Sequence, residues 1–490
     1  MMAVLALALA ASLQALPAIG DTAFVTLESG VTVAVDWIQH RGHTVRSLSV
    51  LTQSAIRDLS VETRDDGTAI RSAVSVWNAG DSAGTPIRRE LGEDAVYWSD
   101  QIPSSLEQVV RRARIVGTPS MTLFGASLYR DARTPIHVER TDSTGWVVTC
   151  NHKRYDVLTD ARGDVLAATL LEHGVTIERR IGFRREDYPL WPAYAAAPGA
   201  RYRAEPVRIP APQGHVLAGT LTLPPGAGPF PGAVLITGLS PHERNNGVPP
   251  WMPFRDIADA LTRRGVAVLR VDDRGVGEST GDRASSTTFD EANDVRTEVA
   301  WLRARKPIDP RRIALVGYSE GGLIAPMVAA SDTLLAGIVT LAGPGVPGPV
   351  VARYQIEAAV VRDTTIAPAA REAEIQRQLA DTLTAREKSY LGIDPLPYAR
   401  RVRCPALILH GGTDLTVPPR SAERLAWAMR SGGNRNVSVQ VFDGISHAFL
   451  PDPDGLPSDW AYLPAFMTSP RVLATITDWA ARWLRLGSVP

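Results

Sequence analysis

Apolar and polar residues follow different patterns in the two halves of the chain. From residue 21 to about residue 188 they alternate in short bursts separated by Gly, Asp and Asn, as at residues 31–35 and 146–149. Alternation with a period of two is typical of strands that are buried on one face. Beyond residue 204, continuous apolar runs alternate with amphipathic stretches, as in parallel strands covered by helices on both sides. The pattern therefore predicts a β-rich domain followed by an α/β domain.

Two local signals refine the first half. Residues 165–171 and 175–177 predict a hairpin, because His173 and Gly174 separate two apolar runs. Ser104 and Glu107 have the spacing of a capping box ahead of apolar residues at helical spacing, which predicts one helix among the strands.

The second half contains one antiparallel hairpin, six further strands and at least two helices by its pattern. Residues 207–223 predict the hairpin, with a turn at residues 212–214. Thr288 and Glu291 predict a capped helix, and a second apolar stripe predicts a helix near residues 472–483. The apolar runs that predict the six strands are residues 233–236, 266–271, 313–317, 338–341, 407–410 and 437–442.

Composition sets the expected domain boundaries and the compartment. Residues 1–20 form an apolar run that ends in small residues, which predicts a signal peptide and a secreted or periplasmic protein. The β-rich domain is expected at residues 21–188, and the Pro- and Ala-rich residues 189–203 predict a linker. The α/β domain then covers residues 204–490, with an inserted helical cap at about residues 343–398.

Charge and cysteine content exclude several classes of protein. The chain has 52 basic and 52 acidic residues and no long run of one sign, so we expect no nucleic-acid partner. We also expect no integral membrane segment after removal of the signal peptide. Cys150 and Cys404 are the two cysteines of the chain, too few for a disulfide scaffold. Cys404 precedes an apolar strand and is expected to be a small core thiol, and a bridge between it and Cys150 would have to cross the two domains. The sequence does not specify an oligomeric state.

The strongest chemical signal is a Gly-x-Ser-x-Gly segment at residues 317–321. It follows an apolar strand and precedes a helix rich in small residues, which is the setting of a nucleophile elbow. Glycines two positions on either side of Ser319 let strand and helix pack closely beneath a strained turn. We therefore predict that Ser319 is a catalytic nucleophile.

A serine hydroxyl needs a base, and the base needs an acid that orients it. In the order serine, acid, histidine, Asp414 and His447 each follow an apolar strand and lie in turns at the same edge of the sheet. His410 is the rival base, but its place at the end of a strand favours a structural role. Asp443 is the rival acid, and its position favours a turn or capping role.

The predicted oxyanion hole consists of main-chain amides. Glu320, directly after the nucleophile, should supply one N–H group, and Leu239, after the turn glycine of the loop at residues 236–241, should supply the other. Gly238 and Ser240 are close alternatives to Leu239.

With these motifs the chain resembles the α/β-hydrolase superfamily, and within it bacterial esterases related to dienelactone hydrolases and to prolyl-oligopeptidase-like catalytic domains. The resemblance covers about residues 205–487 and also rests on the Asp-Arg-Gly-x-Gly-x-Ser turn at residues 273–279 and on Asp394-Pro395. It implies an α/β-hydrolase fold: a mostly parallel sheet with helices on both faces and a helical cap, here preceded by a β-rich domain. The Asp273 turn is expected to position the loop beside the elbow. The loop at residues 237–238 is Thr-Gly, where many relatives have His-Gly or Pro-Gly.

The resulting hypothesis is a serine hydrolase that cleaves small carboxylic esters through an acyl-enzyme and needs no metal or cofactor. A serine peptidase of the prolyl-oligopeptidase type is an alternative, although the first half shows no repeat from which a β-propeller could be built. Lactonase and thioesterase activities are further alternatives. A β-domain binding protein with a relic hydrolase domain is the alternative from outside enzymes.

Overall fold

The computed structural model describes most of the chain. The described residues are 22–28, 31–51, 55–78, 87–91, 95–98, 103–126, 133–150, 153–170, 175–184, 194–197, 200–247, 251–362, 366–381, 383–456 and 468–485. The predicted signal peptide at residues 1–20 lies outside them. The chain divides into two compact units, Met1–Ala193 and Tyr194–Pro490, and this boundary falls inside the predicted linker.

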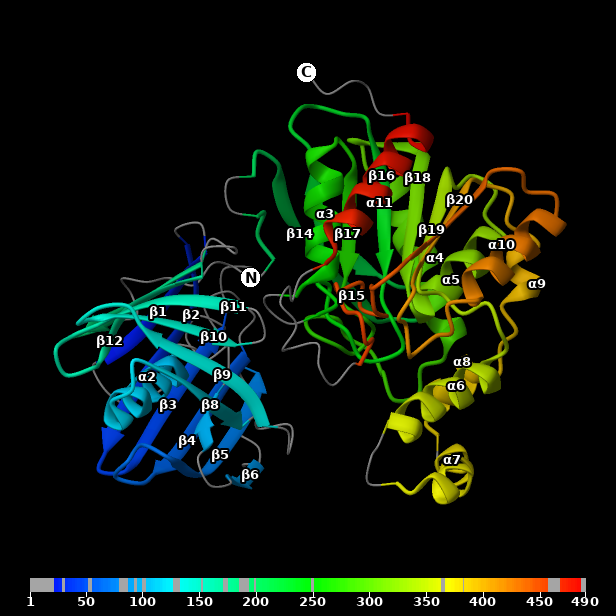
Figure 1. The fold of residues 1–490 in the computed structure, drawn as a ribbon. Coiled ribbons are helices and arrows are strands. Elements are labelled where there is room, and N and C mark those ends of the chain that lie inside the picture. Colours follow the sequence, from blue (N-terminus) through cyan, green and yellow to red (C-terminus); the bar gives the residue numbers. More distant parts are fainter. Residues whose placement is uncertain are drawn as a thin grey trace. The chain divides into compact units, whose positions relative to one another are not determined.

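The first unit is built on one large sheet (blue to cyan in Figure 1). Its strand order is β6-β5-β4-β3-β2-β1-β13-β12-β11-β10-β9-β8-β7, and all pairs are antiparallel except β7 with β8. The predicted hairpin is confirmed, because β12 pairs antiparallel with β13. The strands are β1 (Thr22–Glu28), β2 (Val31–Arg41), β3 (Thr44–Leu51), β4 (Ala55–Thr63), β5 (Ala69–Asn78), β6 (Ile87–Glu90), β7 (Ala95–Tyr97), β8 (Ser120–Ala126), β9 (Arg133–Arg140), β10 (Gly145–Cys150), β11 (Lys153–Thr159), β12 (Val165–Leu170) and β13 (Val175–Ile181).

The expected helix of the first unit is α2 (Ser104–Val116), which packs its apolar stripe against the sheet. The predicted capping box is wrong. Ser104 is already helical, and the residue before α2 is Pro103, which makes no side-chain cap. Glu107 instead reaches the sheet, where it contacts His40 at 2.9 Å and Arg179. The carboxylate of Glu107 therefore forms a long-range ion pair and does not cap the helix as the local motif had predicted.

The second unit contains an eight-stranded sheet in the order β14-β15-β17-β16-β18-β19-β20-β21. The predicted hairpin is confirmed as β14 paired antiparallel with β15, and β15 is also antiparallel to β17. All other neighbours are parallel, as the continuous apolar runs predicted. The strands are β14 (Arg203–Pro210), β15 (Val216–Leu223), β16 (Phe230–Ile236), β17 (Ala267–Val271), β18 (Ile308–Tyr318), β19 (Gly337–Leu341), β20 (Ala406–Gly411) and β21 (Val437–Phe442).

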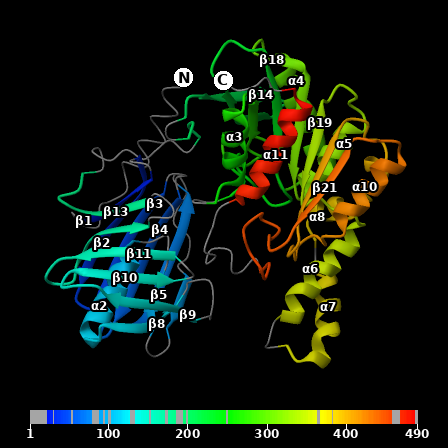
Figure 2. The same ribbon diagram turned by 45° about the horizontal axis from the view of Figure 1, so that its top comes forward.

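Helices cover both faces of this sheet and bury two separate apolar clusters (Figures 1 and 2). On one face lie α3 (Pro253–Arg263) and α11 (Pro470–Trp483), the predicted C-terminal helix. On the other lie α4 (Thr288–Arg303), α5 (Glu320–Ala329), α9 (Leu396–Ala399) and α10 (Ser421–Ser431). The unit has the predicted α/β-hydrolase fold.

The capping box of α4 lies one residue earlier than the sequence suggested. Thr287 is the capping residue: its side chain accepts from the amide of Asp290, whose carboxylate accepts from the amide of Thr287. The predicted pair has other partners. Thr288 donates its hydroxyl to Glu320 at 2.6 Å, and Glu291 forms ion pairs with two arginines.

The segment between β19 and β20, in which the sequence predicted a helical cap, consists of several short helices. α6 (Gly348–Arg362) is followed by the 3₁₀ turn η3 (Pro368–Ala370), α7 (Arg371–Leu379) and α8 (Ala385–Leu391). Figures 1 and 2 show α6 and α7 extending from the body of the unit. Among the described residues, no helix is long and apolar enough to span a membrane.

Candidate active site

Ser319 lies on a strained turn between β18 and α5. Its backbone has φ 55° and ψ −114°, a conformation that few residues other than glycine adopt. Strain of this kind persists only where the surroundings hold it, and here the amide of Ser319 donates to the carbonyl of Leu341 at 2.8 Å. The turn lifts the side chain clear of the end of the strand.

The flanking glycines explain how this turn fits. A Cβ on Gly317 would lie 2.0 Å from the carbonyl oxygen of Gly321, and one on Gly321 would lie 2.3 Å from that of Ile236. Both contacts are with backbone, which cannot move aside. The close approach of strand and helix therefore requires glycine at both positions, as the motif predicted.

The structure brings the three predicted side chains together at the carboxyl ends of β18, β20 and β21. Nε2 of His447 lies 3.2 Å from Oγ of Ser319, and its Nδ1 lies 2.8 Å from Oδ2 of Asp414. An ionised carboxylate can only accept, so Nδ1 donates to Asp414 and Nε2 is left to accept the serine hydroxyl. The ring of His447 also packs against that of Tyr318, with the centroids 5.2 Å apart.

Asp414 is fully buried and its oxygens are saturated with donors. Oδ1 accepts the amides of Thr416 and Val417, both at 2.8 Å. Oδ2 lies 3.0 Å from Nε2 of His410 in addition to its contact with His447. Burial acts to raise the pKa of Asp414, but the two histidines outweigh it and hold this pKa below its usual range. The carboxylate therefore stays ionised beside His447 throughout the neutral range.

The two rivals named from the sequence occupy different places. His410 is fully buried, and its Nε2 lies 3.0 Å from both the carbonyl of Val417 and Asp414, so it contacts the acid and not the serine. Asp443 is exposed in the turn after β21. Sequence reasoning missed that His410 supports Asp414, although their separation of four residues across a strand end was visible.

The predicted oxyanion loop runs beside the nucleophile. A Cβ on Gly238 would lie 3.4 Å from Cβ of Ser319 and 3.5 Å from Nε2 of His242. Glu320 is the first residue of α5, so its N–H group has no acceptor within the helix. Both predicted segments therefore lie beside the serine.

Asp273 holds the loop after β16, as expected for the turn that carries it. Its carboxylate accepts the hydroxyl of Thr237 and, at 3.0 Å, the amide of His242. Arg283 forms an ion pair with it at 3.1 Å. Burial, together with Arg283 and Arg386, lowers the pKa of His242 to about 4, so this imidazole is neutral at pH 7.

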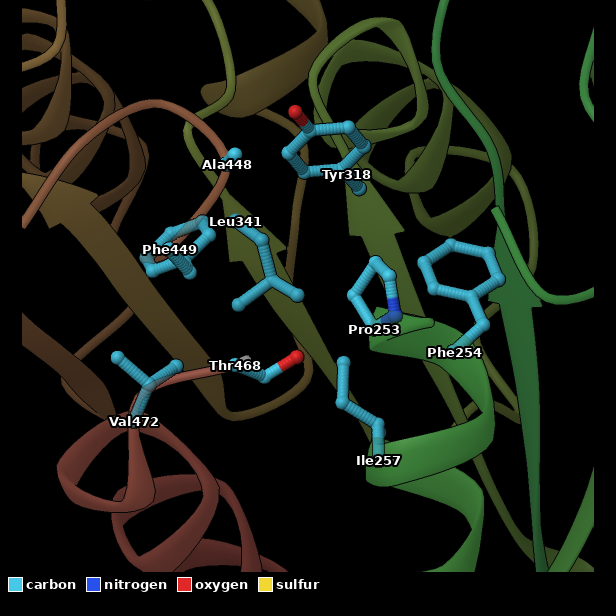
Figure 3. A pocket seen from close by; sticks show the side chains of 9 residues that line it. All are labelled: Pro253, Phe254, Ile257, Tyr318, Leu341, Ala448, Phe449, Thr468 and Val472. Atoms are coloured by element: carbon cyan, nitrogen blue, oxygen red, sulfur yellow. The ribbon is translucent and has the colours of Figure 1, made fainter. Parts of the chain in front are cut away.

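A small apolar cavity lies beneath the turn, lined by residues of α3, α11 and the strand ends. Figure 3 shows Leu341, Phe449 and Val472 facing it, while the hydroxyl of Tyr318 points away. Its volume is about 10 Å³, which is at the lower limit for a single water molecule. It is too small to receive an acyl chain in this conformation.

Two polar side chains of the helical insertion reach the site, and no local sequence signal pointed to either. The hydroxyl of Tyr354 on α6 donates to the carbonyl of Asp414 at 2.8 Å. Arg386 on α8 is buried and contacts both predicted oxyanion segments. A buried cap arginine looks like a surface arginine in a sequence, because its partners are far away along the chain.

The sheet order, the elbow and the hydrogen-bonded serine, histidine and aspartate are together those of an α/β-hydrolase fold. Residues 253–388 match the family model described as serine aminopeptidase, S33. Esterase EstD of Thermotoga maritima is 28% identical over 277 residues, which cover 54% of this chain and 66% of EstD. A thiohydrolase of Arthrinium phaeospermum is 29% identical over 129 residues, 26% of this chain and 40% of that protein. The chain thus spans about two thirds or less of the length of these curated relatives.

Solved structures of hydrolases also align with the chain. The Pyrococcus furiosus esterase Pf2001 aligns with a TM-score of 0.40 and 16% identity, over 58% of this chain and 94% of the esterase. A putative dienelactone hydrolase from Klebsiella pneumoniae aligns with a TM-score of 0.39 and 17% identity, over 59% of this chain and all of that chain.

Proposed function

We propose that the chain is a serine hydrolase that cleaves small carboxylic esters through an acyl-enzyme. The observation that carries the proposal is the continuous hydrogen-bonded chain from Ser319 through His447 to the buried carboxylate of Asp414. The similarity to the esterase EstD supports ester hydrolysis as the reaction.

In the proposed mechanism His447 takes the hydroxyl proton of Ser319 as Oγ attacks the ester carbonyl. The oxyanion of the tetrahedral intermediate accepts hydrogen bonds from the amides of Leu239 and Glu320. His447 then gives the proton to the leaving alcohol, which departs. Water, activated by the same imidazole, attacks the acyl-enzyme and releases the acid. Asp414 orients the imidazole and stabilises its cationic form.

Two other leaving groups are second candidates, because the comparisons name them. The family model over residues 253–388 is described as a serine aminopeptidase, and one relative is a thiohydrolase. The decisive experiment measures kcat/KM for p-nitrophenyl esters of graded chain length beside matched thioesters and aminoacyl p-nitroanilides. We expect the esters to be preferred. A preference for the anilides by tenfold or more would replace the esterase with an aminopeptidase.

Export and the role of the β-rich unit are also proposals. Residues 1–20 would direct the chain out of the cytoplasm, which fractionation of cells that express the full chain would test. The groups proposed for catalysis all belong to the unit that starts at Tyr194. Tyr194 stacks on the buried Arg244 at 3.9 Å, and Tyr202 donates to Asp259 at 2.8 Å. A chain starting at Tyr194 should therefore be more stable than one starting at Ala204, and both should hydrolyse a small ester if the β-rich unit serves only localisation or substrate selection.

A further inference from the structure

Arg386 on α8 is a buried arginine whose guanidinium reaches four groups on three other segments. Nε donates to the carbonyl of Leu239 at 3.1 Å, and one terminal nitrogen donates to Glu320 at 2.6 Å. The other terminal nitrogen contacts Glu291 at 2.8 Å and Ser286 at 3.3 Å. Its side chain is 8% exposed. An arginine this deep and this fully paired has its position set by its partners.

Two of these partners are the residues whose amides would form the oxyanion hole. Leu239 lies in the loop after β16, and Glu320 begins α5, so they belong to segments that are distant in sequence. The planar fork of a guanidinium has fixed spacing between its nitrogens. One rigid group is thus hydrogen-bonded to both segments.

The close backbone packing at Gly321 brings the two segments together, and other side chains restrain each of them by itself. Arg283 donates to the carbonyls of Leu239 at 2.8 Å and Ser240 at 2.9 Å, which holds the loop. Thr288 donates to the second oxygen of Glu320 at 2.6 Å, which holds the start of α5. Arg283 thus bonds to the loop and Thr288 to the start of α5, whereas Arg386 bonds to both Leu239 and Glu320.

The charge of Arg386 matters as well as its shape. Glu320 is fully buried and immediately follows the nucleophile, so an uncompensated carboxylate there would oppose the negative charge that develops on the substrate oxygen. Burial raises the pKa of Glu320, and Arg386 and Thr288 act against that rise. Arg386 neutralises the carboxylate next to the site.

We propose that Arg386 is a positioning residue of the oxyanion hole. From its place on α8 it holds the Leu239 and Glu320 amides at the spacing that the transition state requires. The inference rests on the proposed function and deepens it. The helical insertion would then contribute to turnover itself, because removal of this contact lets the two donors separate.

The test uses the full chain with Arg386→Lys and Arg386→Met, and Arg353→Met as the matched control. Arg353 also belongs to the helical insertion, but its side chain on α6 is 40% exposed and pairs with Glu357 and Glu372. For a small p-nitrophenyl ester we expect kcat of the Arg386 variants to fall by about 10- to 100-fold, somewhat less than the loss of an oxyanion donor. KM should stay within about twofold, and Arg353→Met should match the wild type.

A second readout separates positioning from a general loss of structure. A trifluoromethyl ketone adds to Ser319 as a hemiketal whose oxyanion occupies the same donors, so its inhibition constant should rise by the same factor as kcat/KM falls. Rates are referred to active sites titrated with a fluorophosphonate, which excludes unfolded protein. A kcat within twofold of the wild type, or a fall without the parallel rise in the inhibition constant, would overturn the inference.

If neither Arg386 variant folds, Glu320→Gln carries the test, because it keeps the shape and removes the charge that Arg386 binds. We expect its kcat to fall by about tenfold, and an unchanged kcat would overturn the inference. A wild-type chain that neither cleaves esters nor reacts with the fluorophosphonate would instead refute the proposed function. Active wild type beside equally active variants would refute only the role of Arg386.

Discussion

Both units of the molecule bury carboxylates, but they use them differently. In the first unit Glu107 joins α2 to His40 and Arg179 on the sheet. In the second unit Asp414 and Glu320 hold loops and turns at one edge of the sheet, beside Ser319. The first arrangement fixes one element on another. The second fixes the spacing of the polar groups around Ser319, where negative charge would develop on a substrate.

The difference shows what separates a structural ion pair from a site. A buried pair alone is weak evidence for function, since either unit offers one. What distinguishes the second unit is that its pairs end at the strained residue Ser319 and its neighbours, where a hydroxyl meets an imidazole.

Removal of the nucleophile should have the largest effect. Ser319→Ala should lower kcat for a p-nitrophenyl ester by on the order of 10⁴-fold or more, because it removes the hydroxyl proposed to form the acyl-enzyme. The melting temperature should change little, since one hydroxyl is lost from a turn. Activity within tenfold of the wild type would mean that another residue carries the reaction.

The two histidines on Asp414 should differ sharply. His447→Ala should lose about as much activity as Ser319→Ala, because nucleophile and base act as a unit. His410→Ala should keep most of its turnover per folded molecule, because the contact between His447 and Asp414 remains. Steady-state rates on titrated active sites decide between them, and the reverse order would make His410 the base.

The two candidate acids give the next contrast. Asp414→Asn should lower kcat by about 10²- to 10⁴-fold with little change in KM, because the amide no longer holds the imidazole or stabilises its cation. Asp443→Asn removes an exposed carboxylate and should cost far less. A large fall in kcat for Asp443→Asn, with kcat of Asp414→Asn close to that of the wild type, would identify Asp443 as the acid.

A change in the first unit should affect stability and not chemistry. Glu107→Ala leaves His40 and Arg179 without their buried partner, and breaking a buried pair typically costs about 3 kcal/mol or more. We expect urea to unfold the first unit at a lower concentration, with kcat for a small ester unchanged. A fall in kcat that matched those of the active-site variants would contradict the proposed division between the units.

The smallest expected effect is a loss of folding stability at acidic pH that depends on His242. Because the pKa of His242 is lowered to about 4 in the folded chain, the unfolded chain takes up this proton first as the pH falls. His242 therefore favours the folded state above about pH 6.5 and loses that contribution between about pH 6.5 and 4, by at most about 1.4 kcal/mol per pH unit. His242→Gln should lose less stability than the wild type between pH 7.5 and 5 in urea unfolding. Equal losses would show that His242 is not held neutral.

Much of the second unit could be predicted because its signals are local. The continuous apolar runs correspond to β16 through β21, and the glycines around Ser319 correspond to a turn that a Cβ would prevent. Asp414 and His447 were placed from their positions after two of those strands.

The sequence predictions were wrong where a side chain's role depends on partners that are distant in the sequence. Glu107 and Glu291 were assigned to capping boxes, yet both form ion pairs with groups far along the chain. The roles of Arg386 and Tyr354 were invisible for the same reason, because only the packing of the insertion brings them to the site. A sequence window shows which groups are near in the chain and not which are near in space.

The central claim is that Ser319, activated by His447, is the nucleophile. The most direct measurement is peptide mapping by mass spectrometry after the full chain has reacted with a fluorophosphonate, beside His447→Ala treated identically. We expect one adduct on Ser319 in the wild type and labelling at least 100-fold slower in the variant, because base and nucleophile act as a unit. An adduct on another residue, or equal labelling of both chains, would contradict it.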